Sequence, residues 1–360
     1  MRVRPEKPLC NATPAKSFPT MTINITIKPS DKHYQADPGE TVLAAALRNG
    51  LGLPYSCRGG SCGTCKGKVL EGKVDYGNFQ PQWLTEAEQT EGWALFCCAK
   101  PLTDLVIECD KVRELGDIPI RIVPSRVQKL DKVTDDVIIL ELKLPASEHL
   151  QFLAGQYLDI MLKGGERRSF SMANAPHNNE FVQLHIRHVP GGSFTDHVFT
   201  KMKERDILRI ELPLGSFYLR EDSDKPIVFV ASGTGFAPIK SILEHAFHKG
   251  IERKMVLYWG ARRPKDIYMD ALVKQWAAEH DNFSYVPVMS EATAEDDWAG
   301  RAGFVHQAVM ADFPDLSGHQ VYACGVPIMV DSAKRDFVGK CGLPEDAFYA
   351  DSFTTAADKA

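Results

Sequence analysis

The sequence lacks the features that would mark a membrane, exported or nucleic-acid-binding protein. It has no run of about eighteen apolar residues, so it predicts no membrane-spanning helix. Its 42 basic residues are outnumbered by 47 acidic ones, and the formal charge of −5 gives no general affinity for nucleic acid. The first twenty residues hold no apolar core of a signal peptide. We therefore expect a cytoplasmic protein in which residues 1–21 are a disordered extension, with a mis-assigned start as the alternative.

Internal repeats and low-complexity tracts are also lacking, whereas cysteine is comparatively frequent. In a protein that is not exported, nine cysteines are poor candidates for a disulfide framework, so metal-binding and redox roles are favoured. A chain of 360 residues exceeds the size of one ordinary core and predicts two or three domains.

Three segments differ in their sequence pattern. Residues 22–112 contain short strand-like runs, a helical stretch between Thr41 and Gly50, and six of the nine cysteines. Residues 113–120 are predicted to be a linker. Alternating β-patterned runs over residues 121–222 favour an antiparallel β-barrel. Strand-like and helical runs alternate over residues 223–360, which predicts a parallel α/β sheet. The expected fold is therefore a multidomain α+β protein.

The stretch SCRGGSCGTCK, residues 56–66, places three cysteines in a glycine-rich loop. Cys57, Cys62 and Cys65 have the C-x4-C-x2-C spacing of a plant-type 2Fe–2S site, which needs a fourth cysteine further along the chain. Glycines let such a loop curl around a cluster and expose N–H groups to its sulfurs. Zinc is the weaker alternative because it favours paired C-x2-C elements. Buried structural cysteines would not need the glycines.

The fourth ligand is expected in ALFCCAKP, where Cys97 and Cys98 are adjacent. In a strand these two side chains would point in opposite directions, so only one could face the loop. Residues 22–109 resemble a plant-type ferredoxin, and LFCCAKPLTDLVI is similar to the last-ligand segment of that family. The resemblance implies a β-grasp domain with Cys97 as the fourth ligand and Cys98 as a packed neighbour.

The stretch RRSFSMANAP, residues 167–176, predicts a strand that could contact a flavin. Arg168 could reach a phosphate, Phe170 could stack on a ring, and Ser171 could hydrogen-bond the flavin nitrogen that accepts hydride. Taken alone, the pattern R-x-F-S favours a strand with a surface arginine. Between a ferredoxin-like and a nucleotide-binding segment, it resembles the R-x-Y-S motif of the ferredoxin-reductase family. Phe170 departs from the usual tyrosine, which removes one hydroxyl hydrogen bond of about 1 kcal/mol.

A second flavin-binding segment is expected in GGSFTDHVF, residues 191–199. Two glycines open a helical pattern there and could offer backbone N–H groups to a diphosphate. The resemblance favours FAD over FMN. It implies FAD contacts at Arg168, Ser169, Phe170, Ser171, Gly191, Gly192, Ser193 and Thr195.

Residues 226–250, PIVFVASGTGFAPIKSILEHAFHKG, predict a strand, a glycine turn and a helix. Gly233, Thr234 and Gly235 would lie where the carboxyl end of a strand faces a helix N-terminus, a site for pyrophosphate. Pro238 replaces the third glycine of G-x-G-x-x-G, and the next strand ends in Trp-Gly without an acid for a ribose. A Rossmann dehydrogenase is thus disfavoured, and the pattern resembles the NAD module of ferredoxin reductases.

Residues from two other segments complete the expected nicotinamide site. In YACGVPIM, the resemblance places Cys324 and Gly325 beside the nicotinamide and lets Pro327 begin a helix. Packing alone would also explain Cys324. In GARRPKDIY, Arg262 and Arg263 either bind a 2′-phosphate or belong to a solvated loop, and NADH is preferred over NADPH.

Near the C-terminus, related reductases carry an aromatic residue that covers the flavin, and Phe353 stands at that position. A core residue is the alternative explanation for this phenylalanine. Ser171, Cys324 and Phe353 are the residues expected to take part in hydride transfer.

The order of the segments indicates the function. NAD(P)H releases two electrons as hydride and a 2Fe–2S cluster holds one, so the flavin between them would convert one into the other. A separate acceptor protein is then expected to dock near residues 58–64. Over residues 22–356 the chain resembles reductases that serve CDP-6-deoxyhexulose 3-dehydrases and, second, reductase components of multicomponent oxygenases of the phenol-hydroxylase type. Both groups share every cofactor motif. The alternatives are a free-flavin reductase and a non-enzymatic electron carrier with an inactive reductase half.

Overall fold

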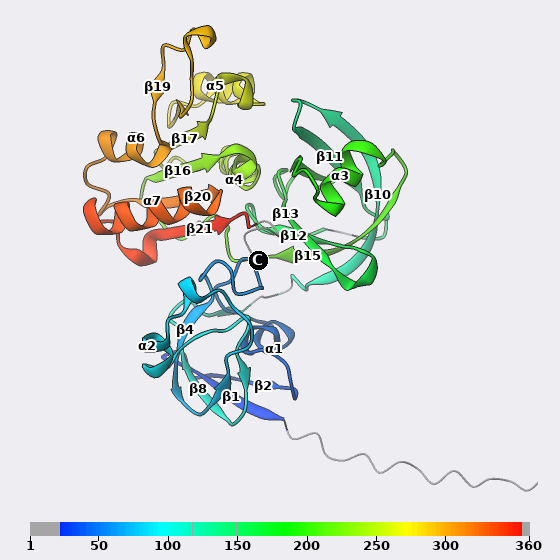
Figure 1. Cartoon of the computed structure of the whole chain (residues 1–360), viewed down its shortest axis with the longest axis vertical. Coiled ribbons are helices and arrows are strands. Elements are labelled where there is room, and N and C mark those ends of the chain that lie inside the picture. The colour runs from blue at the N-terminus through cyan, green and yellow to red at the C-terminus, as the bar shows by residue number, and fades with distance from the viewer. Residues whose placement is uncertain (1–21, 115, 117, 149, 355–360) are drawn as a thin grey trace, which may run out of the picture.

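A computed structural model describes residues 22–114, 116, 118–148 and 150–354, so the predicted extension over residues 1–21 lies outside the described part. The chain forms three bodies (Figure 1). The N-terminal body lies at the bottom of this view, the middle segment at the right and the C-terminal segment at the left and top. The three meet at the centre of the picture, where strand β21 ends.

The N-terminal domain is a mixed five-stranded sheet with the order β2-β1-β8-β4-β6. Strands β1 and β8 are parallel, and the other neighbours are antiparallel. The elements of the sheet and its helices are β1 (Ile23–Lys28), β2 (Lys32–Ala36), α1 (Val42–Arg48), β4 (Lys66–Glu71), α2 (Glu86–Thr90), β6 (Trp93–Leu95) and β8 (Leu105–Glu108). Two small ladders join β3 (Leu51–Gly52) to β9 (Arg113–Glu114) and β5 (Val74–Asp75) to β7 (Lys100–Pro101). Strand β9 thus lies inside the predicted linker.

Helix α1 illustrates how the local sequence sets an element. Thr41 caps its N-terminus by accepting a hydrogen bond from the N–H of Ala44, and Gly50 follows it with a φ of 74°. Val42, Ala45 and Ala46 are buried against the sheet. The helix delivers the chain to the cysteine loop between β3 and β4.

The middle domain is a six-stranded antiparallel sheet with the order β13-β12-β15-β10-β11-β14. Its elements are β10 (Arg121–Lys132), β11 (Val137–Lys143), β12 (Tyr157–Met161), β13 (Arg167–Ser171), β14 (Val182–Arg187), α3 (Ser193–Thr200) and β15 (Ile207–Leu214). The sequence predicted an antiparallel β-barrel. The edge strands β13 and β14 instead meet at a single bridge, Met172 to Leu184, so the described residues form a curled sheet whose ends touch rather than a fully hydrogen-bonded barrel.

The C-terminal domain is a six-stranded parallel sheet with the order β19-β18-β17-β16-β20-β21. Its strands are β16 (Ile227–Ser232), β17 (Met255–Ala261), β18 (Phe283–Met289), β19 (Arg301–Ala302), β20 (Gln320–Gly325) and β21 (Phe348–Ser352). Its helices are α4 (Phe236–Lys249), α5 (Asp270–Glu279), α6 (Val305–Asp312) and α7 (Pro327–Lys340). Strand β16, the first in sequence, lies between β17 and β20, so the winding direction reverses there.

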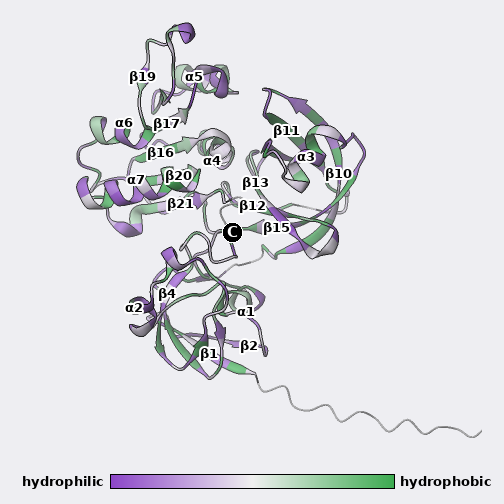
Figure 2. Cartoon of the chain, in the orientation of Figure 1, coloured by the Kyte–Doolittle hydropathy of each residue, from purple (hydrophilic) through white to green (hydrophobic). Residues whose placement is uncertain are grey.

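Separate hydrophobic cores lie on the two faces of this parallel sheet. Helices α4 and α5 cover one face, where Phe229, Leu257 and Trp259 point. Helices α6 and α7 cover the other, above Val230 and Tyr258. Figure 2 shows apolar residues along β16 and β20 and polar residues on α7. Within the described residues, no helix is long and apolar enough to span a membrane.

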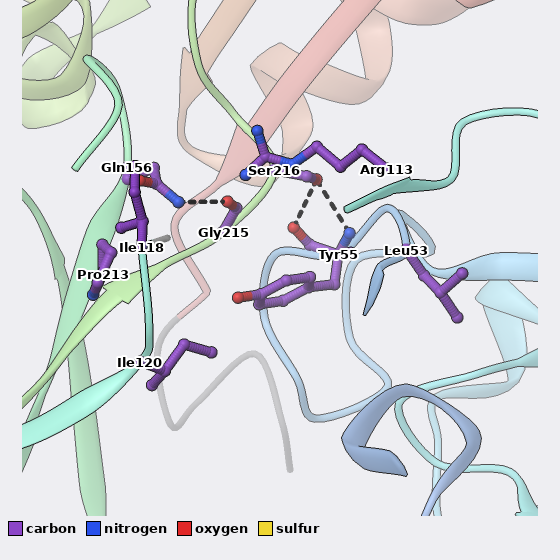
Figure 3. Close-up of a pocket in the computed structure, with 10 residues that line it drawn as sticks. Leu53, Tyr55, Arg113, Ile118, Ile120, Gln156, Pro213, Gly215 and Ser216 are labelled. Atoms are coloured by element: carbon purple, nitrogen blue, oxygen red, sulfur yellow. Dashed lines mark hydrogen bonds between the residues drawn. The ribbon is translucent and has the colours of Figure 1, made fainter. Parts of the chain in front are cut away.

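The N-terminal and middle domains are joined by a packed seam. The core of the N-terminal domain includes Tyr157 and Leu214 of the middle domain. A small pocket at the seam is lined by residues of both domains and of the connecting segment, and Ser216 exchanges hydrogen bonds with the backbone of Tyr55 there (Figure 3). The cysteine loop is therefore fixed against the middle domain.

Candidate active site

The four cysteines predicted as ligands come together in two pairs. Cys62 lies beside Cys57, and Cys65 lies beside Cys97. The backbone N–H groups of Gly59 and Ser61 approach the Cys57 sulfur at 3.4 and 3.3 Å. The loop therefore supplies both the thiols and the backbone donors that a negatively charged cluster requires.

Chemically, this donor set fits a two-iron cluster. The neighbouring thiols and burial raise the pKa of Cys62 and of Cys65, so several thiolates would be stable here only beside a strong positive charge. Among the described residues, no three metal-binding side chains converge on one point as they would around a single ion. Two pairs of cysteines suit a cluster in which each of two irons takes two thiolates.

The conformation of residues 96–99 differs from the prediction. Cys97 and Cys98 lie in a turn after β6, and their sulfurs are 3.5 Å apart rather than on opposite faces of a strand. Gly60, which has a φ of 71°, lies against Cys98: a Cβ on Gly60 would be 2.9 Å from the Cys98 sulfur. The strand argument for choosing between the two cysteines is thus wrong. The pairing of Cys97 with Cys65 still favours Cys97.

Arg58 of the cysteine loop faces inward to the middle domain. Its Nη2 lies 2.5 Å from Asp159 and 3.0 Å from Glu211, and Arg167 also contacts Glu211. Asp159 is 3% exposed, so its charge is compensated inside the protein. An acceptor protein was expected to dock near residues 58–64, but Arg58 is used to hold the domains together.

The predicted flavin strand is β13, paired with β12. Arg168 is partly exposed, and its Nη2 lies 3.4 Å from the hydroxyl of Ser193, so the arginine and the glycine loop predicted for phosphate do meet. Ser169 donates to Asp159 at 2.6 Å. The Phe170 ring is tilted against Phe194 of α3, with centroids 5.5 Å apart.

The glycine segment folds as the sequence predicted. Gly191 has a φ of 79°, Gly192 is the N-cap of α3, and Ser193 is the first helical residue. Thr195 donates through its hydroxyl to the carbonyl of Val189 at 3.0 Å and so closes the loop. The N–H groups at the start of α3 can bind an anion beside Arg168.

Asp351 is a central residue that the sequence reasoning missed. Its carboxylate accepts a hydrogen bond from Ser56 at 2.5 Å and one from Ser171 at 3.4 Å. Burial raises its pKa, and the two hydroxyls partly oppose that shift. Ser56 precedes Cys57, so one buried carboxyl links the cysteine loop to the flavin strand. The sequence feature that could have identified Asp351 was its place as an acidic residue two positions before Phe353.

The glycine turn Gly233–Gly235 follows β16 at the reversal of winding, where ligands of parallel sheets bind. It packs tightly on the end of β20: a Cβ on Gly235 would lie 2.1 Å from the Cys324 carbonyl, and one on Gly325 2.1 Å from the Ser232 hydroxyl. Only glycine allows this approach. Thr234 is in the turn between the two glycines, Pro238 is buried in the first turns of α4, and Pro327 begins α7 as predicted.

A second missed residue, Arg187 on β14, reaches this turn from the middle domain. Its Nη1 occupies the space beside Gly233, where a Cβ would lie 2.7 Å away. Its Nε pairs with Asp136 at 3.2 Å, while its Nη2 is buried without a hydrogen-bond partner among the described residues. An unpaired guanidinium nitrogen at a turn predicted to bind phosphate fits an anionic ligand. The alternating pattern of VQLHIR is typical of a strand and does not single out Arg187 as an anion-binding residue.

The remaining predicted residues surround the same junction. Cys324 is fully buried, burial raises its pKa, and it lies opposite Asp351 in the pairing of β20 with β21. Phe353 packs against the core below α4, and its N–H donates to the Gly325 carbonyl at 2.8 Å. Arg262 lies after β17, is 59% exposed and makes one 3.4 Å contact with Asp266.

Three family models match this chain in the same order as the domains. The model described as a 2Fe-2S iron-sulfur cluster binding domain matches residues 25–102. An oxidoreductase FAD-binding domain matches residues 124–218, and an oxidoreductase NAD-binding domain matches residues 229–335. These matches confirm the cluster, the flavin and the nicotinamide nucleotide as the cofactors of the predicted segments.

Known relatives extend over nearly the whole chain. The CDP-6-deoxy-L-threo-D-glycero-4-hexulose-3-dehydrase reductase of Yersinia pseudotuberculosis is 40% identical over 333 residues, covering 92% of this chain and 99% of the relative. The reductase component of phenol 2-monooxygenase from Pseudomonas sp. is 37% identical and covers 94% and 97%. A crystal structure of an Amycolatopsis cytochrome P450 reductase matches with a TM-score of 0.79 and 34% identity, covering 93% of this chain and all of that one. The chain therefore belongs to the iron–sulfur flavoprotein reductases of oxygenase and dehydrase systems.

Proposed function

We propose that this reductase passes electrons from NAD(P)H, with NADH preferred, through FAD and its 2Fe–2S cluster to a separate protein, a CDP-6-deoxyhexulose 3-dehydrase. The observation that carries the proposal is the junction at Asp351, which binds Ser171 of the flavin strand and Ser56 of the cysteine loop. Two cofactor sites that share one buried carboxylate would be neighbours, which suits direct electron transfer. A cytoplasmic location is proposed with it, since all eight described cysteines are free of disulfides.

Cys57, Cys62, Cys65 and Cys97 are the proposed cluster ligands, with Cys57 and Cys62 on one iron and Cys65 and Cys97 on the other. The proximity of Cys62 to Cys57 and of Cys65 to Cys97 supports this division. The backbone N–H groups that point at Cys57 would stabilise the negative charge of the cluster.

FAD, which would take up a hydride and release its electrons singly, is assigned to β13 and to the start of α3. Arg168 and the N–H groups at the start of α3 would hold its phosphates, Phe170 would pack on a ring, and Ser171 would hydrogen-bond the nitrogen that accepts hydride. The proposed contacts are Arg168, Ser169, Phe170, Ser171, Gly191, Gly192, Ser193 and Thr195.

The nicotinamide nucleotide is assigned to the reversal point of the parallel sheet. Its pyrophosphate would lie on the glycine turn, with the unpaired Nη2 of Arg187 as a further donor. Cys324 would face the nicotinamide together with Ser171, and Phe353 would cover the flavin until the nucleotide arrives. The proposed contacts are Gly233, Thr234, Gly235, Pro238, Arg262, Cys324, Gly325, Pro327 and Phe353.

An oxygenase component is the second candidate acceptor, because relatives that serve phenol 2-monooxygenase and terephthalate 1,2-dioxygenase are each 37% identical to this chain. Either acceptor would approach the part of the cysteine loop around residues 62–64, since Arg58 is engaged with the middle domain.

The test is reconstitution of the loaded reductase. Under anaerobic conditions, NADH should bleach the flavin and the cluster in sequence, and a purified dehydrase with its CDP-sugar should then yield the 3-deoxy product. Product formation with an oxygenase component alone would support the second candidate. Flavin bleaching without cluster reduction, or cytochrome c reduction that is unchanged in Cys62→Ser, would instead indicate a free-flavin reductase. An unbleached flavin would indicate an inactive reductase half.

A further inference from the structure

Two loops at the carboxyl edge of the parallel sheet are locked together by one ion pair. Arg263 follows β17, and Asp296 lies in the loop between β18 and β19. The Nε of Arg263 is 3.0 Å from both carboxylate oxygens of Asp296, and its Nη2 is 2.9 Å from one of them. The same Nη2 donates to the hydroxyl of Thr293 at 3.1 Å. The guanidinium is therefore occupied in a forked geometry.

The position of Arg263 indicates that this ion pair affects the choice between NADH and NADPH. Strand β17 is the neighbour of β16, which carries the glycine turn, and Arg263 is two residues beyond its end. In the related Rossmann-type sheets, residues after the second strand contact the adenosine ribose: an acid binds the free 2′-hydroxyl, and an arginine accommodates a 2′-phosphate. Arg263 thus stands where a 2′-phosphate would be recognised, but its donors point to Asp296.

Asp296 is held in place by its own loop. It accepts hydrogen bonds from the N–H of Thr293 at 2.8 Å and from the Thr293 hydroxyl at 3.1 Å. Its side chain is 12% exposed and lies 2.9 Å from Arg263. The side chain of neighbouring Glu295 is 88% exposed and lies farther from Arg263, at 3.9 Å. Asp296 is therefore a fixed partner and Glu295 a loose one. A phosphate at the ribose would have to displace a carboxylate that the fold holds in place.

We propose that Asp296 is the specificity-determining residue that makes this reductase prefer NADH, by occupying the guanidinium of Arg263 and placing a negative charge where a 2′-phosphate would bind. The inference rests on the proposed function, whose hydride donor it specifies. Of the two adjacent arginines, Arg263 is engaged by Asp296, whereas Arg262 is mostly exposed and lies 3.4 Å from Asp266.

Asp296→Asn tests this proposal with little structural change, because the amide oxygen can still accept from Thr293. In calorimetric titrations of the FAD-loaded protein with adenosine 2′,5′-bisphosphate, this variant should bind at least ten-fold more tightly than wild type. Its kcat/KM ratio for NADPH over NADH should rise by a similar factor. Adding Arg263→Ala to Asp296→Asn should abolish both gains. The control Glu295→Gln should change either quantity by less than two-fold.

Unchanged bisphosphate binding in Asp296→Asn, with native circular dichroism, would overturn the inference. So would a wild type that prefers NADPH, or a gain that survives in the double variant. Wild type that oxidises neither nucleotide would refute the proposed function instead, while the bisphosphate titration would still decide the role of Asp296.

Discussion

The two glycine-rich segments at the ends of the proposed electron path are held in different ways. The cysteine loop is tied by side chains to both other domains, through Ser56 to Asp351 and through Arg58 to Asp159. The glycine turn Gly233–Gly235 is instead packed by close backbone contact with the end of β20 and faces the unpaired Nη2 of Arg187.

This difference follows from what each segment would hold. A cluster stays in the protein through every turnover, so its loop can be built into a buried polar network that fixes its distance from the flavin strand. A nucleotide must enter and leave in each cycle, so its turn keeps donors available that a phosphate can pair with. A fixed arrangement favours electron transfer at one end, and unpaired donors favour reversible binding at the other.

Replacing a cluster ligand should have the largest effect, because it would disable the cluster end of the electron path and leave the nucleotide end intact. Cys97→Ser should abolish the cluster absorbance and cluster reduction, while NADH still bleaches the flavin, because the ligand is lost but the nucleotide end is untouched. Cys98→Ser is the matched control and should keep the cluster. A variant pair with the reverse behaviour would make Cys98 the ligand.

Asp351→Asn should slow electron transfer at both sides of the junction, by at least ten-fold in stopped-flow absorbance. The carboxylate accepts from Ser56 and Ser171, and an amide would reorient both hydroxyls. Ser171→Ala should slow only the reduction of the flavin by NADH, and Ser56→Ala only the step from flavin to cluster. Rates that do not change in any of these variants would mean that the junction is merely structural.

Arg58→Ala tests whether charge pairs hold the cysteine loop on the middle domain. It removes one cation from buried Asp159 and leaves Arg167 at 3.6 Å, so we expect a loss of about 2 kcal/mol in the free energy of unfolding by urea. The flavin-to-cluster rate should fall with it. Lys129→Ala breaks an exposed pair with Asp131 and should cost less than about 0.5 kcal/mol. Equal losses in both variants would refute the docking role.

The smallest effect is expected for Arg168→Ala, which should weaken FAD retention by about ten-fold, since a phosphate contact at a partly exposed site is lost. Retention is measured by the flavin absorbance that remains after dialysis against buffer. Arg126→Ala, at an exposed position of β10, should retain FAD like the wild type. A normal flavin content in Arg168→Ala would mean that another residue contacts the FAD phosphates.

Local features of the structure were predictable because neighbouring residues produce them. Thr41 caps α1, Gly192 caps α3, Gly250 ends α4 with a φ of 65°, and Pro327 begins α7. Each depends on backbone conformation within about one helical turn, so the residue type alone signals it. The spacing of the first three cysteines is local in the same sense.

By itself the sequence determined the cofactor classes, the order of the domains and several helix ends, since spacing, caps and turns act over a few residues. Only the tertiary structure decided how these parts meet. Ser56 and Asp351 are 295 positions apart, and Arg58 and Glu211 are 153 positions apart, so no pattern along the chain could pair them. The turn that holds the Cys97 and Cys98 sulfurs 3.5 Å apart lies against Gly60, which is 37 positions before Cys97 in the chain. Buried charges and hydroxyls take the partners that the folded domains place beside them, because leaving them unpaired away from water is costly.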